Sequence, residues 1–188
     1  MTGAELFPRV VAFGGGAGVR RVLTGLAACM REEEYQRRHD LLTAVVPGAA
    51  GVEEAESLVG HCACVLPATG DAGPVRRAHP EALRRIINAD LIVAISSDVL
   101  VEVKPILAVG GIAATLAAVV APRVFVAPPE RIAPLLPIYR RPPALAAFFD
   151  RVLLDPGETP DRYALARAIL GLVRPDRRVD PPLLDRTA

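Results

Sequence analysis

The chain has 188 residues, of which 52% are hydrophobic and 23% are charged, and its formal net charge is +1. This length and apolar content predict one folded domain and exclude a largely disordered chain. A net charge so close to zero predicts neither a nucleic acid nor an anionic membrane as partner. The most apolar stretch, residues 106–120, is shorter than the ~20 residues of a membrane-spanning helix. The first apolar run is too short for a signal peptide, so we expect a soluble cytoplasmic protein.

The predicted strands and helices alternate along the chain. Strands are short apolar runs rich in β-branched residues, whereas helices repeat apolar residues at helical spacing. The charged segment 31–40 indicates a solvated helix end or a loop, and the segment 49–60 is ambiguous. The strands are predicted at 9–13, 41–46, 62–66, 89–95 and 123–127, and the helices at 19–30, 80–88, 109–120, 144–154 and 163–173.

This alternation predicts an α/β fold, a Rossmann-like parallel sheet with helices on both faces in a three-layer sandwich. The strand at 89–95 is apolar on both sides, which favours a central position. We expect residues 1–128 to form the Rossmann-like core and residues 129–188 to form a proline-rich helical extension packed on the same domain. Such sheets bind ligands at the carboxyl ends of their strands. The segments expected at that edge are 14–18, 47–51, 69–73 and 95–98.

The three cysteines, Cys29, Cys62 and Cys64, do not indicate a disulfide framework, because their number is odd and two of them are nearly adjacent. Cys62 and Cys64 follow His61, a grouping that raises the question of zinc, but no second pair of ligands accompanies it. Residues two apart in a strand share one face, and cysteine packs well in a core. We therefore interpret these cysteines as core residues and predict no metal site.

A glycine-rich loop follows the first predicted strand and precedes a predicted helix. Glycine lets backbone amides approach a ligand closely, and the helix N-terminus adds partial positive charge, so a phosphate is the natural guest. The loop lacks the dinucleotide-binding spacing, because Val19 stands at its sixth position, and it also lacks a Walker lysine. The alternative is a tight turn that binds nothing. The loop residues are Gly14, Gly15, Gly16, Ala17 and Gly18.

Five polar residues are further candidates for ligand binding at this edge. Arg20 either clamps a phosphate or is an exposed helix arginine. Asp71 either holds Mg²⁺ or a ribose hydroxyl, or belongs to an Asx-turn. Ser96, Ser97 and Asp98 follow the predicted central strand, where they either bind a ligand or, for Asp98, cap the next helix.

The opening strand and loop, Val-Val-Ala-Phe-Gly-Gly-Gly-Ala-Gly at residues 10–18, resemble the 2-phospho-L-lactate transferase / gluconeogenesis factor family (CofD/YvcK-like), whose loop typically reads Gly-Gly-Gly-Thr-Gly. The longest match runs from Pro80 to Ile112 and includes Ala-Asp-Leu-Ile-Val at 89–93. Shorter matches lie at 43–46, 66–67 with 70–71, 123–126 and 156–159.

The chain also departs from the family pattern. Family members are much longer, and the missing segment falls between Asp71 and Pro80. Ala50 and Gly51 stand where the transferases have paired metal-binding aspartates, and Ile-Ser-Ser-Asp at 95–98 replaces a Gly-Pro-Gly-Ser turn. Phosphoryl-type transfer depends on metal and on electrostatic positioning of phosphates, so these losses argue against it.

The resemblance therefore implies a shortened, degenerate and non-catalytic relative, a pseudoenzyme that binds a nucleotide or nucleotide sugar and regulates carbon metabolism or the cell envelope. No definite cofactor is assigned. One alternative is a transferase on a nucleotide-linked phospho-substrate, in which Glu53 or Glu54 replaces the aspartates. Another is a structural subunit with a vestigial cleft. The resemblance and the apolar content also predict a homodimer or a place in a larger complex, with contacts through 109–120 and the C-terminal helices.

Overall fold

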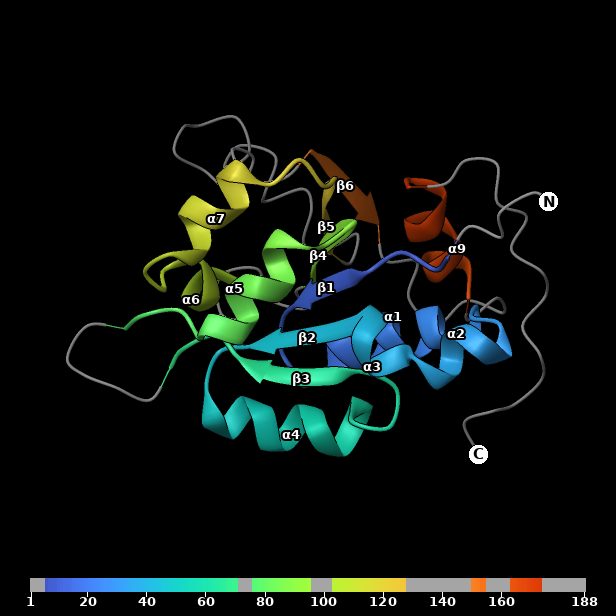
Figure 1. Ribbon diagram of the computed structural model, residues 1–188, viewed down its shortest axis with the longest axis horizontal. Helices are drawn as coiled ribbons and strands as arrows, with labels where there is room; N and C mark the ends of the chain where they lie inside the picture. Colours follow the sequence, from blue (N-terminus) through green and yellow to red (C-terminus); the bar gives the residue numbers. More distant parts are fainter. Residues whose placement is uncertain (1–5, 71–75, 96–102, 128–149, 155–162, 174–188) are drawn as a thin grey trace.

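The computed structural model describes residues 6–70, 76–95, 103–127, 150–154 and 163–173. Its strands are β1 (Val10–Phe13), β2 (Leu42–Val46), β3 (Cys64–Pro67), β4 (Leu91–Ile95), β5 (Arg123–Ala127) and β6 (Arg151–Leu154). They form one parallel sheet in the order β3-β2-β1-β4-β5-β6 (Figure 1). This is the strand order of a doubly wound Rossmann fold, so the predicted fold class is confirmed.

The middle strands are apolar because helices cover both of their sides. Every residue of β1, β2 and β4 is buried, and their sequences, VVAF, LTAVV and LIVAI, are nearly continuous apolar runs. β4 pairs with β1 on one side and with β5 on the other, which confirms its predicted central position. The edge strand β3 is only partly buried.

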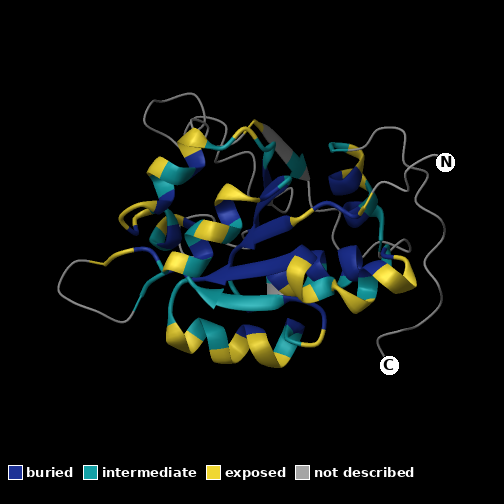
Figure 2. Cartoon of the chain, viewed as in Figure 1, coloured by how far each residue is buried: buried dark blue, intermediate teal, exposed yellow. Residues whose placement is uncertain are grey.

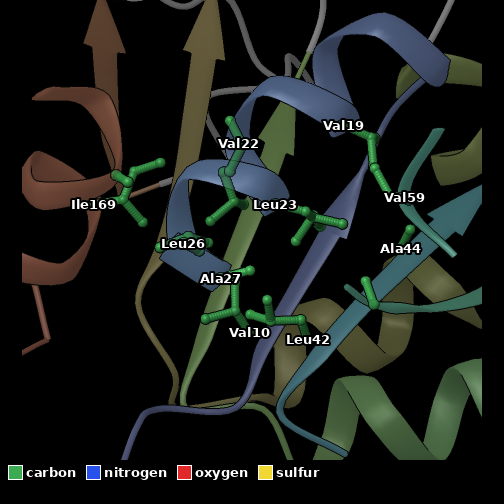
Figure 3. Packing of buried hydrophobic residues seen from close by; sticks show 14 of the residues in the cluster. Val10, Val19, Val22, Leu23, Leu26, Ala27, Leu42, Ala44, Val59 and Ile169 are labelled. Atoms are coloured by element: carbon green, nitrogen blue, oxygen red, sulfur yellow. The ribbon is translucent and has the colours of Figure 1, made fainter. Parts of the chain in front are cut away.

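The helices cover both faces of the sheet and complete three layers. They are α1 (Gly16–Ala28), α2 (Glu32–Gln36), α3 (Arg38–Leu41), α4 (Ala49–Val59), α5 (Pro80–Ile87), α6 (Val103–Leu107), α7 (Ile112–Ala118) and α9 (Ala164–Gly171). On one face, Leu26 of α1, Val59 of α4 and Ile169 of α9 belong to one hydrophobic core (Figure 3). On the other face, Ile86 of α5 packs in a second core with Phe125 of β5. Figure 2 shows the buried strands between helices whose outer sides are exposed.

Two arginine–aspartate ion pairs connect the amino ends of neighbouring strands. The Asp90 carboxylate, just before β4, accepts hydrogen bonds from the backbone N–H, Nε and Nη2 of Arg9, just before β1. The Asp150 carboxylate, just before β6, accepts the same three bonds from Arg123 at the start of β5. Each aspartate thus joins two parallel strands through both side-chain and backbone groups.

Two predicted helix starts are wrong, and glycine is the reason in both places. α1 begins at Gly16 rather than at residue 19, so the end of the glycine loop is already the first helical turn. α7 begins only at Ile112, because Gly111, at φ +100°, precedes the helix and breaks the expected continuous run from 109. The short helix α6 was not predicted, and α7 ends at Ala118.

The helix predicted at 144–154 is also wrong where the structure describes it. Residues Arg151–Leu154 form β6, which pairs in parallel with β5, while residues 144–149 lie outside the described ranges. Sheet pairing decides this conformation, because the apolar run alone suits either state. The helix predicted at 163–173 is confirmed as α9. The domain boundary after residue 128 stays a prediction.

Three segments between β1 and β3 are better defined than the sequence indicated. The charged segment 31–40 contains α2 and α3, and the ambiguous segment 49–60 is α4. Glu34 is buried, and its carboxylate accepts the backbone N–H of Arg31 at 2.9 Å, which caps α2. The third strand begins at Cys64, so Cys62 precedes it and the two cysteines do not share a strand face as predicted.

Candidate functional site at the carboxyl edge of the sheet

The carboxyl ends of β1 and β4 form the topological switch point of the sheet. The chain leaves β1 toward β2 on one side, and it leaves β4 toward β5 on the other. In doubly wound sheets this divergence opens the crevice in which ligands bind. The glycine loop follows β1 directly, so it lies at this point.

Gly14 is the residue on which the close approach of β1, β2 and β4 depends. Its backbone N–H donates to the carbonyl oxygen of Val45 on β2 at 3.4 Å. A Cβ at this position would overlap the carbonyl oxygen of Ile95 at the end of β4. Its φ of +153° is also a conformation that side-chain-bearing residues rarely adopt. Glycine at position 14 is therefore a requirement of the backbone.

The N-cap residue of α1 is a glycine, so it supplies no side-chain hydrogen bond to the backbone N–H groups of the first turn. Gly15 is the N-cap residue, in an extended conformation at φ −84° and ψ 172°. The first intrahelical bond runs from Val19 N–H to the Gly15 carbonyl oxygen at 3.1 Å. The N–H groups of Gly16, Ala17 and Gly18 precede that bond, and no helix residue can accept them. Together with the helix dipole, they make this end of α1 electropositive.

A carboxylate from the neighbouring helix lies beside this loop. A Cβ on Gly16 would overlap Oε1 of Glu54, an exposed residue of α4, and would lie 2.9 Å from Cδ1 of Leu58. Glu54 therefore lies next to the electropositive end of α1. The sequence offered Glu53 and Glu54 as equal substitutes for missing aspartates, and only Glu54 has this contact with a loop glycine. The way in which α4 packs against α1 places Glu54, and not Glu53, next to Gly16. This packing cannot be read from the sequence.

The remaining predicted site residues are placed only in part. Arg20 is exposed on α1, one turn beyond the loop. Ala50 and Gly51 lie in the first turn of α4, after β2, and contribute no carboxylate to this edge. Four predicted residues, Asp71, Ser96, Ser97 and Asp98, lie outside the described residues.

The structure adds His79 at the carboxyl end of β3, a residue that the sequence did not single out. His79 is the N-cap residue of α5, and its backbone N–H donates to the carbonyl oxygen of Ala68 at 3.0 Å. Thr69 and Ala78 form an isolated antiparallel bridge next to it. Its buried Nδ1 has no hydrogen-bond partner among the described residues. A buried ring nitrogen of this kind gives no sequence signal.

Cys62 is a buried core residue as predicted, whereas Cys29 and Cys64 are only partly buried. Burial raises the pKa of the Cys62 thiol to about 11, so this thiol is protonated at neutral pH and is a poor nucleophile. Burial also raises the pKa of Cys64. Within the described ranges, no three His, Cys, Asp or Glu side chains are grouped to hold a metal ion. In the same part of the chain, every helix is too short or too polar to cross a membrane.

No family model matches the sequence, and no curated protein matches it. Among solved structures, the chain is similar to a crystal structure of protein BH3568 from Bacillus halodurans, described as a member of the UPF0052 family. The identity is 17% and the TM-score 0.49, over 66% of this chain and 69% of that chain. A second crystal structure of BH3568 gives 16% identity and a TM-score of 0.49 over 65% and 69%. UPF0052 is the CofD/YvcK-like family.

Proposed function

We propose that this chain is a reduced CofD/YvcK-like protein that binds a nucleotide or nucleotide sugar at the carboxyl edge of its sheet. In this proposal it regulates carbon metabolism or the cell envelope and does not catalyse a reaction. The observation that supports the binding site is the N-terminus of α1 directly behind the glycine loop, where the N-cap residue has no side chain. Backbone N–H groups and a helix dipole that converge at one point favour a phosphate group.

The residues that follow β2 support a non-catalytic role. Ala50 and Gly51 occupy the first turn of α4, at the place where the resembled transferases carry metal-binding aspartates. Their side chains cannot coordinate Mg²⁺, and phosphoryl-type chemistry depends strongly on such a cation. A phosphate held by backbone amides alone lacks the cation on which this chemistry depends.

The position of Glu54 favours one second candidate function, a transferase acting on a nucleotide-linked phospho-substrate. A carboxylate beside a phosphate is repulsive unless a cation lies between them. A Mg²⁺ ion that bridges the Glu54 carboxylate and a bound phosphate would remove this repulsion and polarise the phosphate. Without such an ion, Glu54 weakens phosphate binding at the N-terminus of α1.

A thermal-shift panel of nucleotides and nucleotide sugars, with and without Mg²⁺, separates these candidates. Saturation at 100 times Kd stabilises the protein by about 2.7 kcal/mol, which is a readable shift. For the regulator, Glu54→Gln should bind a few times more tightly without Mg²⁺, because it removes a nearby negative charge that is partly screened by solvent. Glu53→Gln, also exposed on α4, is the matched control and should bind like the wild type.

The transferase predicts the opposite pattern. The wild type would then bind the ligand only in the presence of Mg²⁺. Glu54→Gln would not bind it with or without Mg²⁺. A protein whose melting temperature responds to no member of the panel would contradict both candidates and would favour the structural subunit.

A further inference from the structure

A cavity lies at the amino edge of the sheet, at the opposite ends of the strands from the glycine loop. Its volume is about 310 Å³, which is the lower end of the range for small-molecule sites. The wall is formed by the starts of β1 and β2, the end of α3 and the last turn of α5. The polar residues that line it are Arg9, Asp40, Thr43, Arg84, Arg85 and Asn88.

Thr43 is an unusual residue for a strand in the middle of the sheet. It is 2% exposed and pairs with Val11 in the register of β1 and β2. Within the described residues, no hydrogen bond engages its hydroxyl group, although its backbone is part of the sheet ladder. His79 Nδ1 is the buried side-chain atom without a partner among the described residues, so the Thr43 hydroxyl keeps some access to solvent, whereas a valine would place no polar atom here. Thr43 lines the cavity, where a ligand can form a hydrogen bond with its hydroxyl group.

Hydrogen bonds hold the three arginines around the cavity in place, but these bonds do not use every N–H donor of their guanidinium groups. Nε and Nη2 of Arg9 donate to Asp90, and Nε and Nη2 of Arg84 donate to Glu81. Arg85 donates from Nε to Glu81 and from Nη1 to two carbonyl oxygens of α3. Among the described residues, no hydrogen bond uses Nη1 of Arg9, Nη1 of Arg84 or Nη2 of Arg85. Three oriented guanidinium groups therefore each keep a terminal nitrogen for another acceptor.

Two further groups on the cavity wall accept hydrogen bonds. Nδ2 of Asn88 donates to the carbonyl oxygen of Arg84 at 2.8 Å, so its Oδ1 remains as an acceptor. The Asp40 carboxylate is exposed at the same wall. A bare anion would be repelled by Asp40, whereas hydroxyl groups on a ligand would donate to Asp40 and Asn88.

We propose that this cavity is a separate site for a small phosphate monoester that carries hydroxyl groups. Three arginines line one cavity, and Arg is the residue suited to the recognition of phosphate groups. The Thr43 hydroxyl donates to the same group or to a ligand oxygen. This site goes beyond the proposed function, because it shares no residue with the glycine loop.

Glycerol 3-phosphate tests the proposal, with glycerol as the matched neutral probe. In amide chemical-shift titrations of the full chain, glycerol 3-phosphate should shift the resonances of Val11, Thr43 and Asn88, and glycerol should not. Thr43→Val keeps the volume and removes the hydroxyl, and it should weaken binding about fivefold, while Arg84→Gln should weaken it about tenfold. Thr24→Val is the control, because the Thr24 hydroxyl donates to the Arg20 carbonyl oxygen on another element.

The same titration in Gly15→Val keeps the two sites distinguishable. Binding at the amino edge should survive that change, even if it abolishes every response at the glycine loop. Equal affinity in wild type, Thr43→Val and Arg84→Gln would overturn the proposal, as would shifts confined to residues 14–19. An equal response to glycerol would also overturn it, since the guanidinium groups would then play no part.

Discussion

The two edges of this parallel sheet carry their positive groups in different ways. At the carboxyl edge the positive groups are backbone amides, at the start of α1 behind Gly14 and Gly15. At the amino edge they are arginine side chains, of which Arg9 and Arg123 also fasten neighbouring strands through Asp90 and Asp150. The amides at the carboxyl edge are accessible only because the loop glycines have no side chains. At the amino edge the positive charge belongs to the side chains themselves.

This difference follows from the polarity of a parallel sheet. Strands β1 and β2 run into α1 and α4 through the carboxyl edge, so the N-termini of these helices lie there. Every strand begins at the amino edge, where helix C-termini offer carbonyl oxygens, and arginines such as Arg85 bind them. Substitutions at the two edges should therefore act differently, by backbone strain at one and by lost ion pairs at the other.

Gly14→Ala at the carboxyl edge should cause the largest loss in the free energy of unfolding. The added Cβ would overlap the Ile95 carbonyl oxygen in a conformation that alanine avoids, so we expect a loss of about 3 kcal/mol in the free energy of unfolding. Gly171→Ala is the matched control, because it adds a methyl group with no neighbour within 4 Å at the end of α9. Urea denaturation should show no loss for that control. A loss below about 1 kcal/mol for Gly14→Ala would mean that the loop backbone is not fixed by β4.

Asp150→Asn at the amino edge should lower the free energy of unfolding by a smaller amount. Hydrogen bonds from the Arg123 guanidinium hold the pKa of Asp150 below its usual value, so the pair stabilises the protein above the unfolded pKa of about 3.9. The substitution should cost about 1 kcal/mol at pH 7, since the carboxylate is half exposed. As pH falls below about 4, this carboxylate is protonated first in the unfolded chain and, at still lower pH, in the folded protein, so the difference from wild type should shrink. A difference that is constant from pH 7 to pH 2 would show that the charge is not involved.

Hydrophobic patterning predicted most of the fold, because parallel strands covered on both sides need continuous apolar runs. The segments that became β1, β2, β4 and β5 have such runs and were placed within two residues of their observed starts. Residues 151–154 have the same composition as a buried helix turn, and only pairing with β5 makes them a strand. Local sequence does not carry that information.

The candidate site was predictable only where it consists of backbone. Four glycines after a strand indicate a phosphate-binding turn, because their function depends on the absence of side chains. The approach of Glu54 to Gly16 depends on how α4 packs against α1, and the cavity around Thr43 depends on α5 lying over two strand starts. Both are contacts between elements distant in sequence, so neither follows from spacing.

The most direct measurement is calorimetric titration of the nucleotide or nucleotide sugar that gives the largest thermal shift into wild type, Gly15→Val and Gly171→Ala. Gly15 has an extended backbone that valine adopts without strain, so this variant should stay folded while its side chain covers the amides of α1. We expect tight binding to wild type and to Gly171→Ala, and at least a hundredfold loss in Gly15→Val, as if most of the amide contacts to the phosphate were removed. Unchanged affinity in a folded Gly15→Val would contradict the account, because the ligand would then bind away from the glycine loop.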